Sequence, residues 1–212
     1  MITFAVPKGR IFKEISDLLL KCNFPKFDYK SASRNLVVQT ENPDVRILVV
    51  RSQDVPTYVS YGAADLGVVG SDVLDECESE SVYQPLDLKI GSCRLSVAVQ
   101  NTKYYKSLMD SEMPITIATK YPRQASEYFC TKGKNVNLVK LYGSIELAPL
   151  VDLSHGIVDL VSTGETLKAN GLVEVEVVKN VSSRLIVNKA SLKLKDNLLT
   201  EILEGLRSVV DD

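Results

Sequence analysis

The amino-acid sequence predicts an α/β protein built as two lobes. Apolar residues alternate between strand-like and helix-like spacing along the whole chain. This alternation forms two series that separate near residues 89–93, and the 212 residues are enough for two cores. We expect a first lobe formed by residues 1–91 and 180–212, and a second lobe formed by residues 92–179.

The first series alternates strands with helices that have recognisable start signals. Its first helix carries apolar residues along one stripe. Pro56 fits the first turn of a short helix after Asp54. Ser71 and Asp72 are of the type that caps a helix. The expected strands are 2–6, 36–39, 46–50 and 66–69, and the expected helices are 11–22, 55–61 and 73–77.

The second series has the same alternation. Pro122 opens a helix that Gly133 closes, and Gly171 stops the helix that begins at Gly164. Ser144 is expected to cap a helix that continues to about residue 153. The expected strands are 94–99, 115–119, 138–141, 157–161, 173–178 and 184–188, and the expected helices are 122–129, 144–153, 164–170 and 198–210.

This order of elements indicates where a ligand would bind. Strand–helix alternation implies largely parallel sheets, and we expect the C-terminal helix to return to the first lobe. Open α/β lobes bind ligands beyond the carboxyl ends of their strands. Two lobes that face each other would enclose a cleft, so the active site is expected there.

Composition excludes several classes of protein. The net charge of −2 lacks the basic surplus of a nucleic-acid-binding protein. No apolar run approaches the roughly 20 residues of a membrane span, and the N-terminus does not resemble a signal peptide. We therefore expect a cytoplasmic protein without a membrane or nucleic-acid partner.

Cysteine and histidine give no sign of a metal centre. The only histidine, His155, lies in an expected surface loop, and the cysteines are far apart without metal-ligand spacing. We expect each cysteine to be a small buried side chain. The cysteines are Cys22, Cys77, Cys93 and Cys130.

The segment 157–167 carries the clearest functional signal. A buried strand containing Asp159 breaks into a short polar loop at the expected start of a helix. Glycine permits a tight turn there, and free N–H groups at a helix start bind phosphate. Asp159 would stand beside ribose hydroxyls or a metal bound to a sugar phosphate. An ordinary threonine-capped helix is the alternative. The loop consists of Ser162, Thr163, Gly164, Glu165 and Thr166.

Three cations follow expected strands of the first lobe. Lys8 and Arg10 flank Gly9 after the first strand, and Arg51 closes a run of apolar residues. Residues 1–51 hold nine Lys and Arg against five Asp and Glu, which suits an anionic ligand. Lysine and arginine at a sheet edge bind polyphosphate oxygens. The alternatives are solvated side chains, and for Arg51 a salt bridge with Asp54.

Three further residues are candidates, and one acidic residue is not. Gly70 leaves room for a flat ligand such as a base, with Asp72 beside it, although no P-loop lysine follows. Asp65 is interpreted as structural. Glu146 follows a strand and would share ribose hydroxyls with Asp159, or else complement a helix dipole in its first turn.

Together these segments resemble ATP phosphoribosyltransferase, the enzyme that opens histidine biosynthesis. The run VDLVSTGETLKANGL at 158–172 is specific, and the matching stretches span nearly the whole chain in family order. They are 6–11, 46–59, 62–72, 87–95, 116–122, 142–149 and 158–172.

The resemblance implies two lobes like those of type II periplasmic binding proteins. It implies transfer of the phosphoribosyl group of phosphoribosyl pyrophosphate (PRPP) to N1 of ATP, with release of pyrophosphate and with Mg²⁺ held mainly by substrate phosphates. By the family pattern, residues 162–166 hold the 5′-phosphate, and Glu146 and Asp159 hold ribose hydroxyls. The residues facing pyrophosphate and ATP are Lys8, Arg10 and Arg51, with Arg34, Gly70 and Asp72 as further ATP-side candidates.

The chain is similar to the short form of this family. The long form continues into a histidine-binding domain, whereas this chain stops after its last helix. The short form implies a separate regulatory subunit resembling histidyl-tRNA synthetase, in a hetero-octamer of four and four, and weak or absent activity without it. A solute-binding protein and another phosphoribosyltransferase are the rival interpretations.

Overall fold

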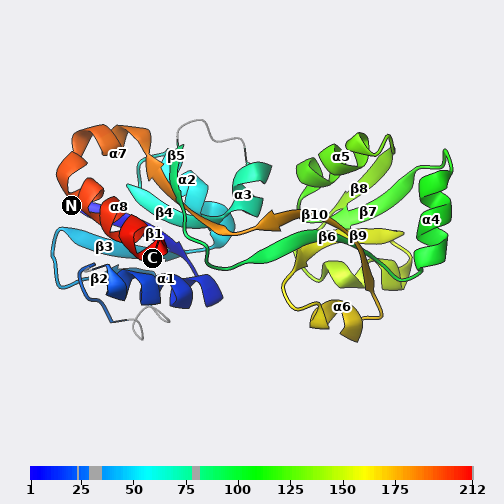
Figure 1. The fold of residues 1–212 in the computed structure, drawn as a ribbon, viewed down its shortest axis with the longest axis horizontal. Helices are drawn as coiled ribbons and strands as arrows, with labels where there is room; N and C mark the ends of the chain where they lie inside the picture. Colours follow the sequence, from blue (N-terminus) through cyan, green and yellow to red (C-terminus); the bar gives the residue numbers. More distant parts are fainter. Residues whose placement is uncertain (23, 29–34, 78–81, 212) are drawn as a thin grey trace. The chain divides into compact units, whose positions relative to one another are not determined.

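The structure, a computed structural model, describes residues 1–22, 24–28, 35–77 and 82–211. It separates into two compact units (Figure 1). Unit 1 contains Met1–Gly91 and Ser182–Asp212, and unit 2 contains Ser92–Val181. The chain returns to unit 1 after residue 181, whereas residue 179 was expected, because the last strand of unit 2 continues to Val181.

Unit 1 is built on a mixed sheet with the strand order β2-β3-β1-β4-β11-β5. The central strand β1 runs parallel to β3 and β4, while the β2–β3, β4–β11 and β11–β5 pairs are antiparallel. The expectation of a largely parallel sheet is therefore wrong. The strands are β1 (Ile2–Pro7), β2 (Val37–Gln39), β3 (Val45–Val50), β4 (Leu66–Gly70), β5 (Val82–Asp87) and β11 (Ser183–Asn188).

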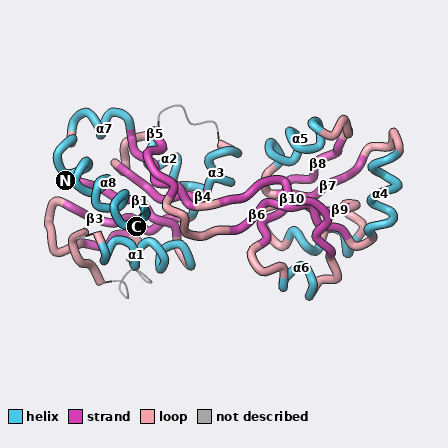
Figure 2. Tube along the Cα trace, viewed as in Figure 1, coloured by secondary structure: helices cyan, strands magenta, loops and turns pink. Residues whose placement is uncertain are grey.

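Both faces of β1 are buried, as expected of a strand between helical layers. Phe4 packs in one core with Ile15 of α1 and Leu206 of α8, and Ala5 packs in another with Val59 of α2. The C-terminal helix thus returns to unit 1, as expected (Figure 2). The helices are α1 (Arg10–Lys21), α2 (Val55–Ser60), α3 (Ser71–Glu76), α7 (Lys189–Leu194) and α8 (Asp196–Asp211).

Unit 2 also has a mixed sheet, in the order β10-β6-β9-β7-β8. β7 is parallel to β8 and β9, and β6 is antiparallel to β9 and β10. One core contains Phe129 of α5, and the other contains Leu167 of α6. The elements are β6 (Cys93–Val99), α4 (Thr102–Asp110), β7 (Ile115–Thr119), α5 (Pro122–Thr131), β8 (Val136–Lys140), β9 (Gly156–Val161), α6 (Glu165–Ala169) and β10 (Val173–Val181).

The helix expected over 144–153 is wrong. Two 3₁₀ turns stand in its place, η3 (Ile145–Leu147) and η4 (Pro149–Val151). Ser144 is left-handed with φ 50° and makes no capping bond. Pro149 has no N–H to continue the first turn, and the left-handed Asp152, with φ 56°, ends the second.

Other local expectations also change. Helix α3 begins at Ser71 with Gly70 at its N-cap, so Ser71 and Asp72 lie inside its first turn and do not cap it. Helix α4 was not expected; the side chain of Asn101 caps it by accepting from the amide of Tyr104 at 3.0 Å. Helix α7 and strand β5 were not expected either.

His155 and the cysteines differ from their expected settings. Nδ1 of the half-buried His155 accepts from the Thr116 amide at 2.9 Å, so this residue anchors a strand and is not a plain surface residue. Cys22 and Cys93 are half-buried and Cys77 and Cys130 are exposed, so none is the buried side chain that was expected. Within the described ranges, no helix is both long and apolar enough to cross a membrane.

Candidate functional site

Lys8 and Arg51 follow two paired strands at one edge of the unit 1 sheet. β1 and β3 run parallel, and their register ends with Pro7 opposite Val50. The amide of Lys8 continues this ladder by donating to the carbonyl of Val50 at 3.0 Å. The next residues along both strands, Lys8 and Arg51, are exposed. The sheet therefore brings these two expected site cations to the same carboxyl edge.

The side chains of these cations differ in their surroundings. Among the described residues, neither the Lys8 nor the Arg51 side chain has an ion-pair partner, so the alternative salt bridge between Arg51 and Asp54 does not form. Arg10 begins α1, and its Nε lies 3.3 Å from the carboxylate of Glu14. Lys8 and Arg51 therefore remain available to an anion, whereas Arg10 is tied to its own helix.

Gly70 lies at the same edge, at the end of the neighbouring parallel strand. β4 pairs with β1 with Ala5 opposite Gly67, so three residues further on Gly70 stands level with Lys8. A Cβ at position 70 would lie 2.0 Å from Oδ1 of the buried Asp72. The space expected for a base is thus taken by the Asp72 carboxylate. Arg34 lies outside the described residues.

In unit 2, β9 ends at Val161 and a short exposed loop leads into α6. Gly164 has φ 81°, a left-handed conformation that favours glycine. The amide of Glu165 reaches the hydroxyl of Thr163 only at 3.4 Å, which is long for this kind of hydrogen bond. The N-cap residue is Gly164, which has no side chain that could cap the helix. The threonine cap that was the alternative interpretation is therefore weak.

Asp159 and Glu146 belong to segments that share a core with the residues flanking this loop. Asp159 is half-buried on β9, and its Oδ1 accepts from the amide of Leu160 at 2.8 Å. Glu146 is half-buried on η3. Its neighbour Ile145 shares one apolar cluster with Val161. η3, β9 and α6 are thus held together by a common core, with both carboxylates on the segments that it joins.

Arg94 and Glu174 form an ion pair beside the loop that sequence reasoning missed. Nε and Nη2 of Arg94 each lie 2.5 Å from a different oxygen of Glu174. Nη1 of Arg94 donates to the carbonyl of Ser162 at 3.2 Å. The hydrogen bond from Arg94 lowers the pKa of Glu174. The pair also borders a depression of about 380 Å³ beside Gly164. β-alternation places Arg94 on a sheet face, but it does not reveal its cross-strand partner.

Asp65 is structural, as expected. Its buried carboxylate accepts from the Thr3 amide at 2.8 Å, from Ser191 Oγ at 2.6 Å and from Lys195 Nζ at 2.8 Å. Burial raises the pKa of Asp65, but the hydrogen bonds from Lys195, Ser191 and Thr3 outweigh it and lower the pKa overall. Asp65 thus ties β1 to α7.

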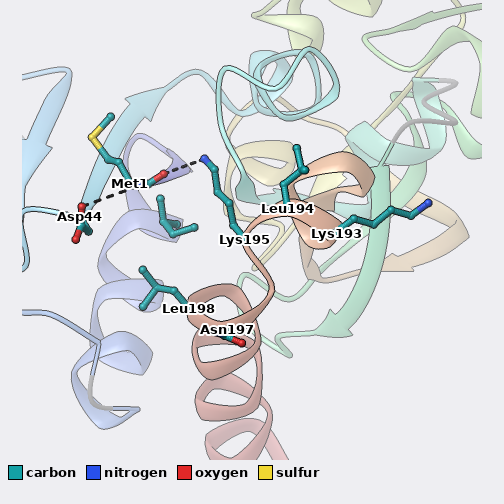
Figure 3. A pocket seen from close by; sticks show the side chains of 8 residues that line it. Met1, Asp44, Lys193, Leu194, Lys195, Asn197 and Leu198 are labelled. Atoms are coloured by element: carbon teal, nitrogen blue, oxygen red, sulfur yellow. Dashed lines mark hydrogen bonds and ion pairs between the residues drawn. The ribbon is translucent and has the colours of Figure 1, made fainter.

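A depression of about 450 Å³ lies beside this contact (Figure 3). In it the ammonium of Lys195 points at the carbonyl of Met1, 2.8 Å away. None of the expected site residues that the structure describes lines it. The lining residues are Met1, Ile2, Asp44, Lys193, Leu194, Lys195, Asn197 and Leu198.

Known proteins resemble this chain in sequence. A family model described as HisG, ATP phosphoribosyltransferase, matches residues 51–208. The ATP phosphoribosyltransferase of Albidiferax ferrireducens is 52% identical over 210 residues, covering 99% of this chain and 99% of that protein. The enzyme of Nitrosomonas europaea is 51% identical over 209 residues, covering 99% of this chain and 97% of its own.

Solved structures resemble it in fold. The ATP phosphoribosyl transferase (HisG:HisZ) complex from Thermotoga maritima matches with a TM-score of 0.82 and 32% identity, covering 100% of this chain and 99% of that one. A putative periplasmic sulfonate-binding protein, SsuA, from Methylobacillus flagellatus matches with a TM-score of 0.61 and 12% identity, covering 98% of this chain and 67% of that one. The second likeness concerns the fold alone and confirms the expected resemblance to periplasmic binding proteins. The chain belongs to the ATP phosphoribosyltransferase family, whose members are pentosyltransferases of the first step of histidine biosynthesis.

Proposed function

We propose that this chain transfers the 5-phosphoribosyl group of PRPP to N1 of ATP and releases pyrophosphate. The observation that carries the proposal is the exposed loop between β9 and α6, in which a left-handed Gly164 turns the chain into the helix. Backbone N–H groups at such a turn bind a phosphate monoester, particularly with hydroxyl groups beside them.

In this proposal, unit 2 binds PRPP. Residues 162–166 hold the 5′-phosphate through amides and the hydroxyls of Ser162, Thr163 and Thr166. Glu146 and Asp159 accept hydrogen bonds from the ribose hydroxyls. Their place on segments that share a core with the residues flanking the loop supports this assignment. A Glu and an Asp suit hydroxyl donors because ionised carboxylates only accept hydrogen bonds.

Unit 1 supplies the cations for pyrophosphate and the phosphates of ATP. Lys8 and Arg51 stand exposed at one sheet edge, with Arg10 beside them at the start of α1. Arg34 and Asp72 complete the proposed ATP side, whereas Gly70 leaves no room for a base because the Asp72 carboxylate occupies that space. Two polyanions repel each other, so fixed cations lower the cost of bringing them together.

The chemistry is a displacement at the anomeric carbon of PRPP. The N1 lone pair of adenine forms the new bond to C1 while the bond from C1 to the pyrophosphate oxygen breaks, and its electron pair leaves with pyrophosphate. N1 needs no deprotonation, so no general base is required. The protein orients N1 against C1 and stabilises the charge that develops on pyrophosphate.

Mg²⁺ is the proposed metal, held mainly by substrate phosphate oxygens. Mg²⁺ keeps several waters and usually takes only one or two carboxylates from a protein. Asp159 fits this role as an oxygen donor beside the phosphate loop. When bound, the ion neutralises phosphate charge.

The chain is proposed to work in the cytoplasm with a separate regulatory subunit resembling histidyl-tRNA synthetase, in a hetero-octamer of four and four. The resemblance to the short form carries this, together with the 32% identical Thermotoga maritima chain, whose structure is that of a HisG:HisZ complex.

Pyrophosphate release from PRPP tests the function against its rivals. The full chain should be assayed with ATP and with other bases and nucleotides, both alone and with the proposed regulatory subunit. We expect release with ATP, increased by the partner. Binding of PRPP without release would indicate a solute binder, and release with a different base would indicate another phosphoribosyltransferase.

A further inference from the structure

We propose that Arg94 and Glu174 act as a positioning pair that holds the phosphate loop, residues 162–166, in the shape that accepts the 5′-phosphate of PRPP. This inference rests on the proposed function of that loop. It adds two residues of neighbouring strands, outside the loop itself, to the determinants of PRPP affinity.

The strand order explains how Arg94 reaches the loop. β6 lies between β10 and β9, and Arg94 pairs with Val161, the last residue of β9. The carbonyl that Arg94 contacts, at 3.2 Å, belongs to Ser162, the first residue beyond that strand. The contact therefore fixes the chain at the point where it leaves the sheet and turns into the loop.

Glu174 fixes the guanidinium in turn. Its two oxygens receive Nε and Nη2 of Arg94, the fork geometry in which arginine binds a carboxylate most tightly. Ser96 Oγ also donates to Glu174, at 2.8 Å. The side chains of Arg94 and Glu174 are only 33% and 23% exposed, so water competes less with this pair than with a fully exposed one.

The geometry assigns Arg94 a role through the backbone and not by direct contact with phosphate. Each of its three guanidinium nitrogens already has a partner, and Glu174 balances its charge. The Thr163 hydroxyl restrains the loop only weakly, because it reaches the Glu165 amide at 3.4 Å. Gly164 contributes no side chain. Without Arg94, the peptide after Ser162 gains freedom and the loop amides lose their common direction.

The pair is tested with Glu174→Gln, which keeps the size of the side chain but removes its charge, and with Arg94→Lys, which keeps the charge but removes the fork. A charge-assisted hydrogen bond accounts for at least about tenfold in affinity. We therefore expect PRPP to bind about tenfold more weakly to each variant by calorimetry, while inorganic pyrophosphate binds with unchanged affinity. In the active enzyme, KM for PRPP should rise about tenfold while kcat and KM for ATP stay within about twofold.

The control is Glu127→Gln, which removes the charge from an exposed Arg123–Glu127 pair of the same unit. It should bind PRPP like the wild type. Far-UV circular dichroism and thermal unfolding establish that each variant is folded, and Glu174→Gln alone decides if Arg94→Lys does not fold. Two results would indicate a general structural role and overturn the proposal. One is an equal loss of affinity for PRPP and pyrophosphate, and the other is a decrease in kcat together with an increase in both KM values.

A loop variant separates this inference from the function on which it rests. If Gly164→Val abolishes PRPP binding and Glu174→Gln leaves it unchanged, the positioning pair is wrong and the phosphate loop stands. If Gly164→Val itself binds PRPP normally, the loop assignment is wrong and the pair loses its role with it.

Discussion

Lys8 and Arg51 stand side by side because β1 and β3 run parallel and end in register, with Pro7 opposite Val50 and the Lys8 amide 3.0 Å from the Val50 carbonyl. Backbone pairing thus places two exposed cations next to each other, although 43 positions separate them (51 − 8). Neither side chain has an ion-pair partner among the described residues. Two adjacent exposed cations without ion-pair partners are available to an anion, so we expect them to act in catalysis.

Replacing Arg51 should reduce catalysis strongly. Removing one charge-stabilising contact commonly raises the barrier by about 2.7–4 kcal/mol, so Arg51→Ala should lower kcat/KM roughly 100-fold or more in steady-state assays. Arg207→Ala removes another exposed arginine of unit 1, on α8, and should leave the kinetics unchanged. If Arg51→Ala retains the wild-type kcat and KM values, Arg51 is not part of the active site.

A β-branched residue at position 164 should abolish PRPP binding. Gly164 has φ 81°, where valine is strained and will pull the loop out of shape. Calorimetry should detect no PRPP binding to Gly164→Val, while circular dichroism shows a native fold. Gly133→Val is the matched control, because Gly133 is also left-handed, with φ 67°, but lies after α5. Equal losses of PRPP affinity in both variants would point to general strain and not to the loop.

Asp65 should matter for stability and not for chemistry. Asp65→Asn removes the partner of Lys195 and weakens the contacts with Thr3 and Ser191. Asp65 is buried but Lys195 is 39% exposed, so we expect a loss of about 2 kcal/mol in free energy of unfolding, mainly from the weakened hydrogen bonds of the buried carboxylate, measurable by urea denaturation. Asp211→Asn, in the exposed pair with Lys89, should change stability by less than about 1 kcal/mol. Similar stabilities for the two variants would contradict the structural role of Asp65.

The same carboxylate predicts a loss of stability in acid. The pKa of Asp65 in the folded chain lies below its ordinary value of 3.8. The folded state therefore binds fewer protons, and the stabilisation is complete above about pH 4 and is lost as pH falls through the folded pKa. Urea unfolding between about pH 6 and pH 3 should show a smaller decrease for Asp65→Asn than for the wild type. Equal decreases would show that Asp65 is not the group responsible.

Much of the fold follows from local patterns in the sequence. Proline has a restricted backbone conformation, and Pro56 and Pro122 signal the starts of two helices. Glycine has a permissive one, and Gly70 signals the end of a strand. The mixed strand directions were missed because pairing partners lie far apart in sequence. β11, for example, returns from unit 2 to lie antiparallel to β4. No local periodicity encodes that return.

The residues of the candidate site also differ in how far the sequence predicts them. The positions of Lys8, Arg51 and Gly164 could be predicted, because Lys8 and Arg51 directly follow strands and Gly164 lies in the loop after β9. Arg94 and Glu174 were not, because their contact depends on the register between β6 and β10, which contains bulges. The expected helix cap at Ser144 is wrong because the prediction relied on its polar side chain, whereas its backbone adopts a left-handed conformation.

The central claim is that this chain joins C1 of the ribosyl group to N1 of ATP. The most direct measurement uses PRPP labelled with ¹³C at C1 and ATP labelled with ¹⁵N at N1, with the full enzyme and its proposed regulatory subunit. We predict a one-bond ¹³C–¹⁵N coupling in the product, appearing together with pyrophosphate. Pyrophosphate without that coupling, or no product from ATP at all, would contradict the proposed reaction.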